Sequence, residues 1–266
     1  MGRVLGPVRS DRTVHRGDGA MRQGLFFLLV LMAMPAGVTG ANAACIDPAT
    51  LVRSTVNITR EFEADERKDA PAILGIRGTG WFLSPRLMVT AAHVAEAMRL
   101  SAQDWKQIEL RESDRGQVIP ARILRVAGSH AEKVAVIELK AAFPSAAALP
   151  VRTAPLVAEE QLLSLAYPDG KLRFAKGRFA EYGTGERLAG MALIEMHDGD
   201  DRLVLDHGAS GAPVLDCEGR VVAVVSTLIT QTIALPTGPV RVSTAWQTPN
   251  VLSIPAGVLK DLSSAE

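Results

Sequence analysis

Short apolar or alternating runs, separated by turn residues, recur along most of the chain. Gly, Pro, Asp and Ser fill the gaps between the runs, which is typical of strands joined by turns and not of alternating strands and helices. The pattern therefore predicts an all-β barrel or sandwich. The expected strands are residues 73–76, 81–83, 87–90, 118–126, 134–139, 161–166, 172–174, 203–205, 221–227 and 240–245.

Helical signals are sparse by comparison. One short helix is expected between Thr90 and Arg99, and a second is expected to start near Ser253, with Pro255 in its first turn, and to run through Leu262. The charged stretch at 60–70, REFEADERKDA, is interpreted as a surface loop or a fraying helix without chemistry of its own.

Composition excludes some classes of partner. The chain carries 29 basic and 29 acidic residues, so no net charge would draw it to nucleic acid or to an anionic membrane surface. We expect neither of these partners, and the sequence leaves the oligomeric state undetermined.

The segment from Met21 to Ala44 has the layout of a secretory signal. Arg22 precedes an apolar run at 25–34, and small residues ending in Ala-Asn-Ala follow. Pro35 and the glycines after it make the run too short for a membrane-spanning helix, which needs about 20 apolar residues. We expect cleavage near Ala43, no membrane span afterwards and a periplasmic or secreted product; whether translation starts at Met21 stays open.

Two cysteines, Cys45 and Cys217, remain after such processing. An even number of cysteines in an oxidising compartment favours one disulfide. The alternative, two unpaired thiols, stays open because sequence does not show whether their Cα atoms approach each other.

Two further segments carry groups suited to acyl transfer. His93 follows an apolar run and two alanines, where a strand is expected to turn into a helix, and Ser210 lies in the segment GASGAP at 208–213. Glycine permits positive φ, so the N–H groups of Gly208 and Ser210 can point together at a developing oxyanion. A structural histidine and a plain loop serine are the alternatives, but the two motifs in this order favour a general base and a nucleophile.

With these residues the chain resembles the chymotrypsin-like serine peptidases, in particular the bacterial exported trypsin-like branch. The matching segments are VTAAHV at 89–94 and GASGAPV at 208–214, supported by GTGWFL at 78–83, AYPDG at 166–170 and GRVVAVVS at 219–226. The resemblance implies two six-stranded antiparallel β-barrels with a short C-terminal helix, and no metal or cofactor. The expected parts are an extension and signal peptide at 1–43, an N-terminal segment at 44–69, a first barrel at 70–150 and a second barrel with the helix at 151–266.

The resemblance also implies roles for individual residues. Ser210 would be the nucleophile, His93 the general base, and the N–H groups of Gly208 and Ser210 the oxyanion hole. The family places an aspartate directly before the strand at 134–139, where this chain has Lys133, which cannot accept a proton from the imidazole. Glu132 is adjacent, but neighbouring strand residues point to opposite faces, so it would serve only if the backbone bulges there.

Substrate preference is read from the same resemblance. The base of the main specificity pocket falls at Val204, with Thr227 near its wall, and the absence of a carboxylate there favours a small or medium apolar side chain. The leading function is an exported serine endopeptidase that cleaves a peptide or protein substrate. The alternatives are a catalytically inactive protease-fold protein that binds peptides or proteins, because of Lys133, and an acyl hydrolase that does not act on peptides.

Overall fold

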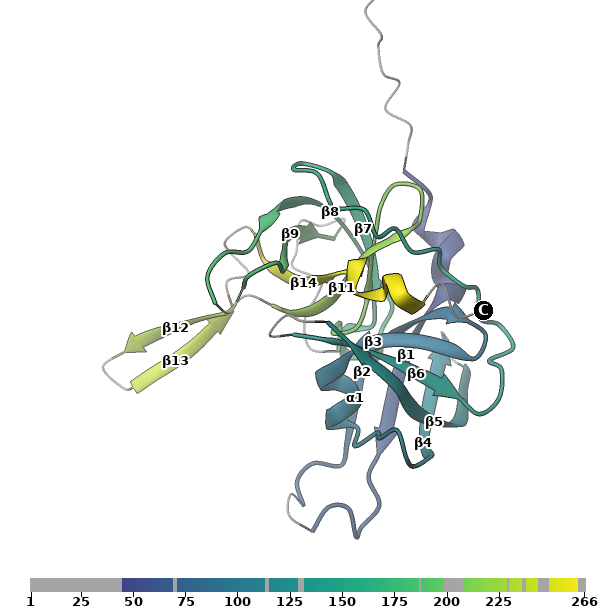
Figure 1. The fold of residues 1–266 in the computed structure, drawn as a ribbon. Helices are drawn as coiled ribbons and strands as arrows, with labels where there is room; N and C mark the ends of the chain where they lie inside the picture. Colours follow the sequence, from purple (N-terminus) through teal and green to yellow (C-terminus); the bar gives the residue numbers. More distant parts are fainter. Residues whose placement is uncertain are drawn as a thin grey trace, which may run out of the picture. The chain divides into compact units, whose positions relative to one another are not determined.

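The structure of the chain is a computed structural model. It describes residues 45–68, 71–112, 115–128, 132–186, 188–198, 208–228, 230–235, 238–243 and 249–262. In these ranges the chain forms two closed, six-stranded antiparallel β-barrels (Figure 1), which confirms the predicted fold class.

The first barrel closes in the order β1-β2-β3-β6-β5-β4. Its strands are β1 (Thr55–Glu61), β2 (Gly75–Ser84), β3 (Leu87–Ala91), β4 (Lys106–Glu112), β5 (Arg115–Ala127) and β6 (Val134–Leu139). The first strand therefore comes from within the stretch 44–69, where the sequence predicted no strand. Val56 and Ile58 of β1 are fully buried and alternate with Asn57 and Thr59, which is the periodicity of a strand.

The second barrel closes in the order β10-β11-β14-β9-β8-β7. Its strands are β7 (Gln161–Ala166), β8 (Arg173–Tyr182), β9 (Ala192–His197), β10 (Pro213–Leu215), β11 (Val221–Leu228) and β14 (Val251–Pro255). Between β11 and β14 the chain forms a separate two-stranded sheet of β12 (Thr230–Leu235) and β13 (Gly238–Ser243) (Figure 1).

Helical elements are short. In the described part of the chain they are the 3-10 helices η1 (Pro48–Ser54), η2 (Pro168–Gly170) and η3 (Ala256–Leu262), and one α-helix, α1 (Ala92–Ala97). The predicted start of the C-terminal helix near Ser253 is wrong, because β14 runs to Pro255 and closes the barrel between β9 and β11. Among the described residues, no helix is both long and apolar enough to span a membrane.

The prediction of a surface loop at 60–70 is wrong at its start. Arg60 belongs to β1, is only 5% exposed and lies 2.6 Å from a carboxylate oxygen of Glu66. Burying a guanidinium is costly unless it is paired with an opposite charge. The carboxylate of Glu66 therefore stabilises the buried position of Arg60 in the first barrel. The hydrogen bond from Arg60 lowers the pKa of Glu66 to about 2.

The barrels share an apolar core, to which β6 contributes directly. Ala135 and Ile137 belong to the apolar cluster inside the first barrel, whereas Val134 and Val136 belong to a second cluster, which also includes Leu163 and other residues of the second barrel. Both faces of β6 are thus buried, which explains its unbroken apolar run. Because Val134 at the start of β6 and Val89 near the end of β3 belong to the second cluster, these parts of the two strands lie at the interface between the barrels.

Candidate active site

The loop that carries Ser210 is shaped by two glycines with positive φ. Gly208 has a φ of +99° and Gly211 a φ of +91°. A Cβ atom on Gly211 would lie 2.1 Å from both Thr79 O and Thr90 Oγ1, so only glycine fits there. The Gly211 N–H donates to Val225 O at 2.8 Å, which fixes the loop to β11.

Thr79 of β2 fixes the same loop from the first barrel. Its Oγ1 donates to Gly208 O at 2.7 Å and accepts from the Tyr167 N–H at 3.0 Å, and its own N–H donates to Ser210 O at 3.0 Å. The hydroxyl and the backbone N–H of one residue therefore tie the serine loop to the first barrel. Thr79 lies in the GTGWFL segment, for which the sequence predicted no role in the site.

His93 is the second residue of α1, directly after β3, as the sequence predicted. Its Nδ1 lies 3.4 Å from Glu132 Oε2, and the two side chains are 43% and 35% exposed. The distance is within the range of an ion pair and long for a hydrogen bond. Within the described residues, the contact with Glu132 occupies Nδ1 and leaves the second imidazole nitrogen, Nε2, for a substrate or nucleophile.

Glu132 reaches His93 without a β-bulge. It lies in a bend two residues before β6 begins, so the alternation of side chains along a strand does not apply to it. The Lys133 carbonyl accepts a hydrogen bond from the Ala92 N–H at 2.8 Å, which ties this bend to the start of α1. The Lys133 side chain is exposed, while the carboxylate of its neighbour faces the histidine.

Ser226 joins the two halves of the site, and sequence reasoning missed it. Its Oγ donates to Glu132 Oε2 at 2.9 Å, and its carbonyl accepts a hydrogen bond from Ser210 Oγ at 2.8 Å. The register of β11 against β14 shifts between Val225 and Thr227, which places Ser226 at an irregularity of the strand. Ser226 is the last residue of the GRVVAVVS segment, and its position directly after an apolar run is the one sequence feature that could have indicated a role in the site.

His93 and Ser210 line one cavity of about 380 Å³. Among the described residues these two side chains share no hydrogen bond, since the serine hydroxyl is directed to Ser226 O. Gly208, whose N–H was predicted for the oxyanion hole, borders the same cavity. The remaining lining residues are Ile76, Arg77, Val94, Ala97 and Asp169.

The remaining predicted site residues are those of the specificity pocket and the two cysteines. Val204 lies outside the described residues, and Thr227 lies in β11, paired with Leu252 of β14. Cys45 and Cys217 form a disulfide, which joins the start of the described chain to the turn after β10. The adjacent Ile46 N–H donates to Cys217 O at 2.9 Å.

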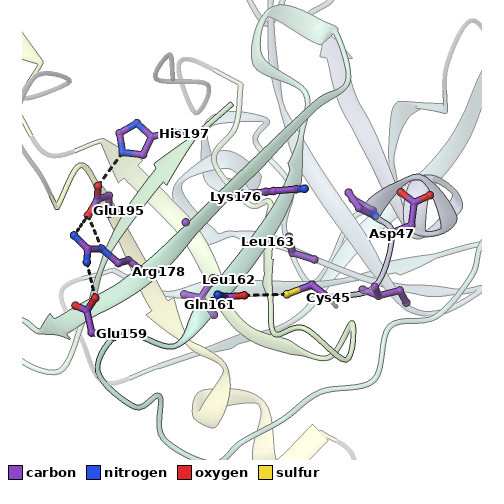
Figure 2. Close-up of a pocket in the computed structure, with 13 residues that line it drawn as sticks. Cys45, Asp47, Glu159, Gln161, Leu162, Leu163, Lys176, Arg178, Glu195 and His197 are labelled. Carbon is purple, nitrogen blue, oxygen red and sulfur yellow. Dashed lines mark hydrogen bonds and ion pairs between the residues drawn. The ribbon is translucent and has the colours of Figure 1, made fainter. Parts of the chain in front are cut away.

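A larger cavity of about 820 Å³ lies away from His93 and Ser210. It borders β7, β8 and β9 together with Cys45 and Asp47 (Figure 2). Arg178 lies between the carboxylates of Glu159 and Glu195 at 2.5 and 2.9 Å. Because mixed charges line it and no nucleophile is paired with a base there, the smaller cavity is the better candidate for catalysis.

No group of three or more His, Cys, Asp or Glu side chains in the described part of the chain is placed to hold a metal ion.

Comparison with known families agrees with this geometry. The model of the trypsin-like peptidase domain matches residues 78–224, which include His93, Glu132 and Ser210. The chain belongs to the trypsin-like peptidase family. No curated protein matches it.

Solved structures show the same fold. The active form of the Rv3671c protease from M. tuberculosis superposes with a TM-score of 0.54 and 18% identity, covering 82% of this chain and 86% of that one. An inactive form of a serine-to-alanine mutant of Rv3671c from M. tuberculosis H37Rv has a TM-score of 0.50 and 19% identity, covering 82% and 91%. At this identity the likeness concerns the fold alone.

Proposed function

We propose that this protein is an exported serine endopeptidase that cleaves peptide bonds through an acyl-enzyme on Ser210. The observation that carries the proposal is the contact of Glu132 Oε2 with His93 Nδ1, in a site whose cavity His93 shares with Ser210. This contact supplies a carboxylate for the imidazole although position 133 is a lysine. Membership of the trypsin-like peptidase family supports the same reaction class.

The proposed reaction assigns one task to each side chain. With its Nδ1 proton directed to Glu132, His93 has an unprotonated Nε2 that accepts the Ser210 hydroxyl proton. Ser210 Oγ then attacks the substrate carbonyl carbon. His93 returns the proton to the leaving amine, and water afterwards hydrolyses the acyl-enzyme by the same route.

The oxyanion of each tetrahedral intermediate would lie at the N–H groups of Gly208 and Ser210. Thr79 supports this role, because its contacts with Gly208 O and Ser210 O fix the peptide units of the loop before any substrate arrives. Donors held in place in this way need no reorganisation as charge develops, which is the basis of electrostatic catalysis.

One rearrangement precedes the attack. The Ser210 hydroxyl donates to Ser226 O, so its proton has to turn to His93 Nε2 when substrate is present. A neutral hydrogen bond of this type contributes about 0.5–1.5 kcal/mol, which is small beside a catalytic barrier. The cost of the turn is therefore compatible with an active enzyme.

Export is part of the proposal. It is supported by the signal-like segment at 21–44 and by the disulfide between Cys45 and Cys217, a bond that persists mainly in oxidising compartments.

Labelling with a fluorophosphonate probe tests the proposal. We expect the folded protein to be labelled, Ser210→Ala and His93→Ala to lose the label, and Glu132→Gln to be labelled far more slowly. Glu96→Gln is the matched control, since Glu96 is an exposed carboxylate of α1 outside the cavity. No labelling of the folded protein at any pH would overturn the enzyme and favour the inactive peptide-binding alternative.

Comparison of peptide and ester substrates separates endopeptidase activity from that of an acyl hydrolase that does not act on peptides. Cleavage of an internal peptide bond, lost in Ser210→Ala, is expected. Hydrolysis of simple esters alone would contradict the proposed substrate class.

A further inference from the structure

A second hollow, of about 480 Å³, adjoins the cavity that contains His93 and Ser210. The two hollows share Ile76 and Arg77, the second and third residues of β2. The second hollow continues along the chain toward the loop between β1 and β2, at the bottom of Figure 1. A peptide in the first cavity can therefore extend into the second without leaving the surface of the first barrel.

The wall of the second hollow is largely aliphatic. It includes Ala72, Ile73 and Leu74, of which Ile73 is 47% and Leu74 64% exposed. A single exposed leucine needs no explanation, but adjacent aliphatic side chains that border a hollow continuous with a candidate active site indicate a binding surface. Glu61 and Thr59 complete the rim.

The edge of β2 that faces the serine loop offers backbone groups to a peptide. Thr79 directs its N–H to Ser210 O and its carbonyl to Thr90 Oγ1 on that edge. In an antiparallel strand, residues two apart direct both backbone groups to the same edge, so Arg77 faces it as well. Among the described strands, β3 pairs with β2 only from Trp81 onward, which leaves this edge at Arg77 without a strand partner.

Three contacts involve described residues of the connection between β1 and β2. The Phe62 N–H donates to Leu74 O at 2.9 Å, which continues the pairing of β1 with β2. Arg60 binds Glu66 within the loop, and the Arg99 side chain at the end of α1 donates to Glu66 O. A preformed wall lowers the cost of ordering the loop on binding.

We propose that the hollow at 72–77 binds the leaving-group side of the peptide substrate and prefers an aliphatic side chain there. The inference rests on the proposed endopeptidase function. His93, which would protonate the leaving amine, lines the cavity that shares Ile76 and Arg77 with this hollow. The pocket for the residue before the scissile bond is predicted at Val204, outside the described residues, with Thr227 of β11 near its wall. Ile73 is four residues from Arg77, about 13 Å of extended chain, so the preferred residue falls two to four positions after the scissile bond.

Partitioning of the acyl-enzyme between water and added amines tests this inference. An ester substrate forms the acyl-enzyme, and the tripeptide amides Gly-Leu-Leu-NH₂ and Gly-Ser-Ser-NH₂ then compete with water for it. We expect the leucine peptide to be favoured about three- to tenfold, the range for partial burial of one or two aliphatic side chains. The ratio of transfer products reports the leaving-group side alone, because both amines meet the same acyl-enzyme.

Leu74→Ser and Ile73→Ser should each reduce the preference toward unity and leave hydrolysis of the ester unchanged. Val118→Ser is the matched control, since Val118 of β5 is 63% exposed and does not line the hollow. Equal partitioning of the two amines, or a preference that survives Leu74→Ser and Ile73→Ser, would overturn the inference while leaving the endopeptidase in place. Absence of an acyl-enzyme, seen as no fluorophosphonate labelling, would refute the proposed function and this inference with it.

Discussion

Glu132→Gln keeps the size of the side chain and removes the charge that lies beside His93. In the proposed mechanism that charge stabilises the imidazolium formed as Ser210 attacks, and it keeps the Nδ1 proton directed away from the reaction. The neutral amide cannot replace the charge, and its NH₂ group can donate to Nδ1 and thereby stabilise the wrong tautomer. The expected result is a large fall in kcat with little change in KM, because the interaction strengthens in the transition state.

The size of the fall follows from the geometry. At the observed 3.4 Å, two unit charges attract by about 1.2 kcal/mol in bulk water and about 4.9 kcal/mol at an effective dielectric constant of about 20. His93 and Glu132 are 43% and 35% exposed, so solvent screens the pair and the upper figure is not reached. With about 1.4 kcal/mol for each factor of ten, we expect kcat/KM to fall about 10- to 1,000-fold, less than the roughly 10,000-fold fall in kcat known for the buried carboxylate of a serine protease.

Steady-state kinetics on one peptide substrate measures the effect, with Glu96→Gln as the charge-matched control on α1. Thermal unfolding of both variants shows whether either change disturbs the fold. If Glu132→Gln keeps the kcat/KM of the unmodified protein while Ser210→Ala abolishes activity, Glu132 is not the orienting carboxylate, and a dyad of His93 and Ser210 remains.

Three further substitutions test other parts of the site and fold. Ser226→Ala should lower kcat/KM about tenfold, because a hydrogen bond to a charged group contributes about 1.5–3 kcal/mol and Glu132 loses one; unchanged kinetics would contradict this role. Gly211→Ala should lower the free energy of unfolding in urea by more than about 2 kcal/mol, well beyond Gly185→Ala, which carries the backbone strain alone because its Cβ meets nothing within 4 Å. Glu66→Gln should lower stability by about 1–3 kcal/mol at pH 7. The folded-state pKa of Glu66 is lowered from 4.5 to about 2, so this difference should vanish as the pH falls through that interval, whereas Asp65→Asn should show none of it.

The sequence predicts most of the fold because its strong signals are local. The apolar runs of β3, β6, β7 and β11 fall where the strands lie, and the motifs around His93 and Ser210 lie at the ends of strands. The predicted start of the C-terminal helix fails because strand pairing in the barrel overrides the local helix preference of the sequence. Pro255 is a good first residue for a helix, yet it ends β14, because that strand is needed between β9 and β11 to close the second barrel.

Glu132 shows why the third member of the site could not be assigned from sequence. The opposite orientation of neighbouring side chains would exclude Glu132 only if the strand already included residue 132. The strand begins at Val134, and the bend before it is tied by the Lys133 carbonyl to the Ala92 N–H, beside the histidine. The resemblance puts Lys133 at the position of the family's aspartate, but the carboxylate that lies 3.4 Å from His93 Nδ1 belongs to the neighbouring residue, Glu132. A carboxylate that orients the imidazole has to lie at the right distance from it, whichever residue carries the carboxylate. A substitution at the expected position is therefore weak evidence that a protease has lost its activity.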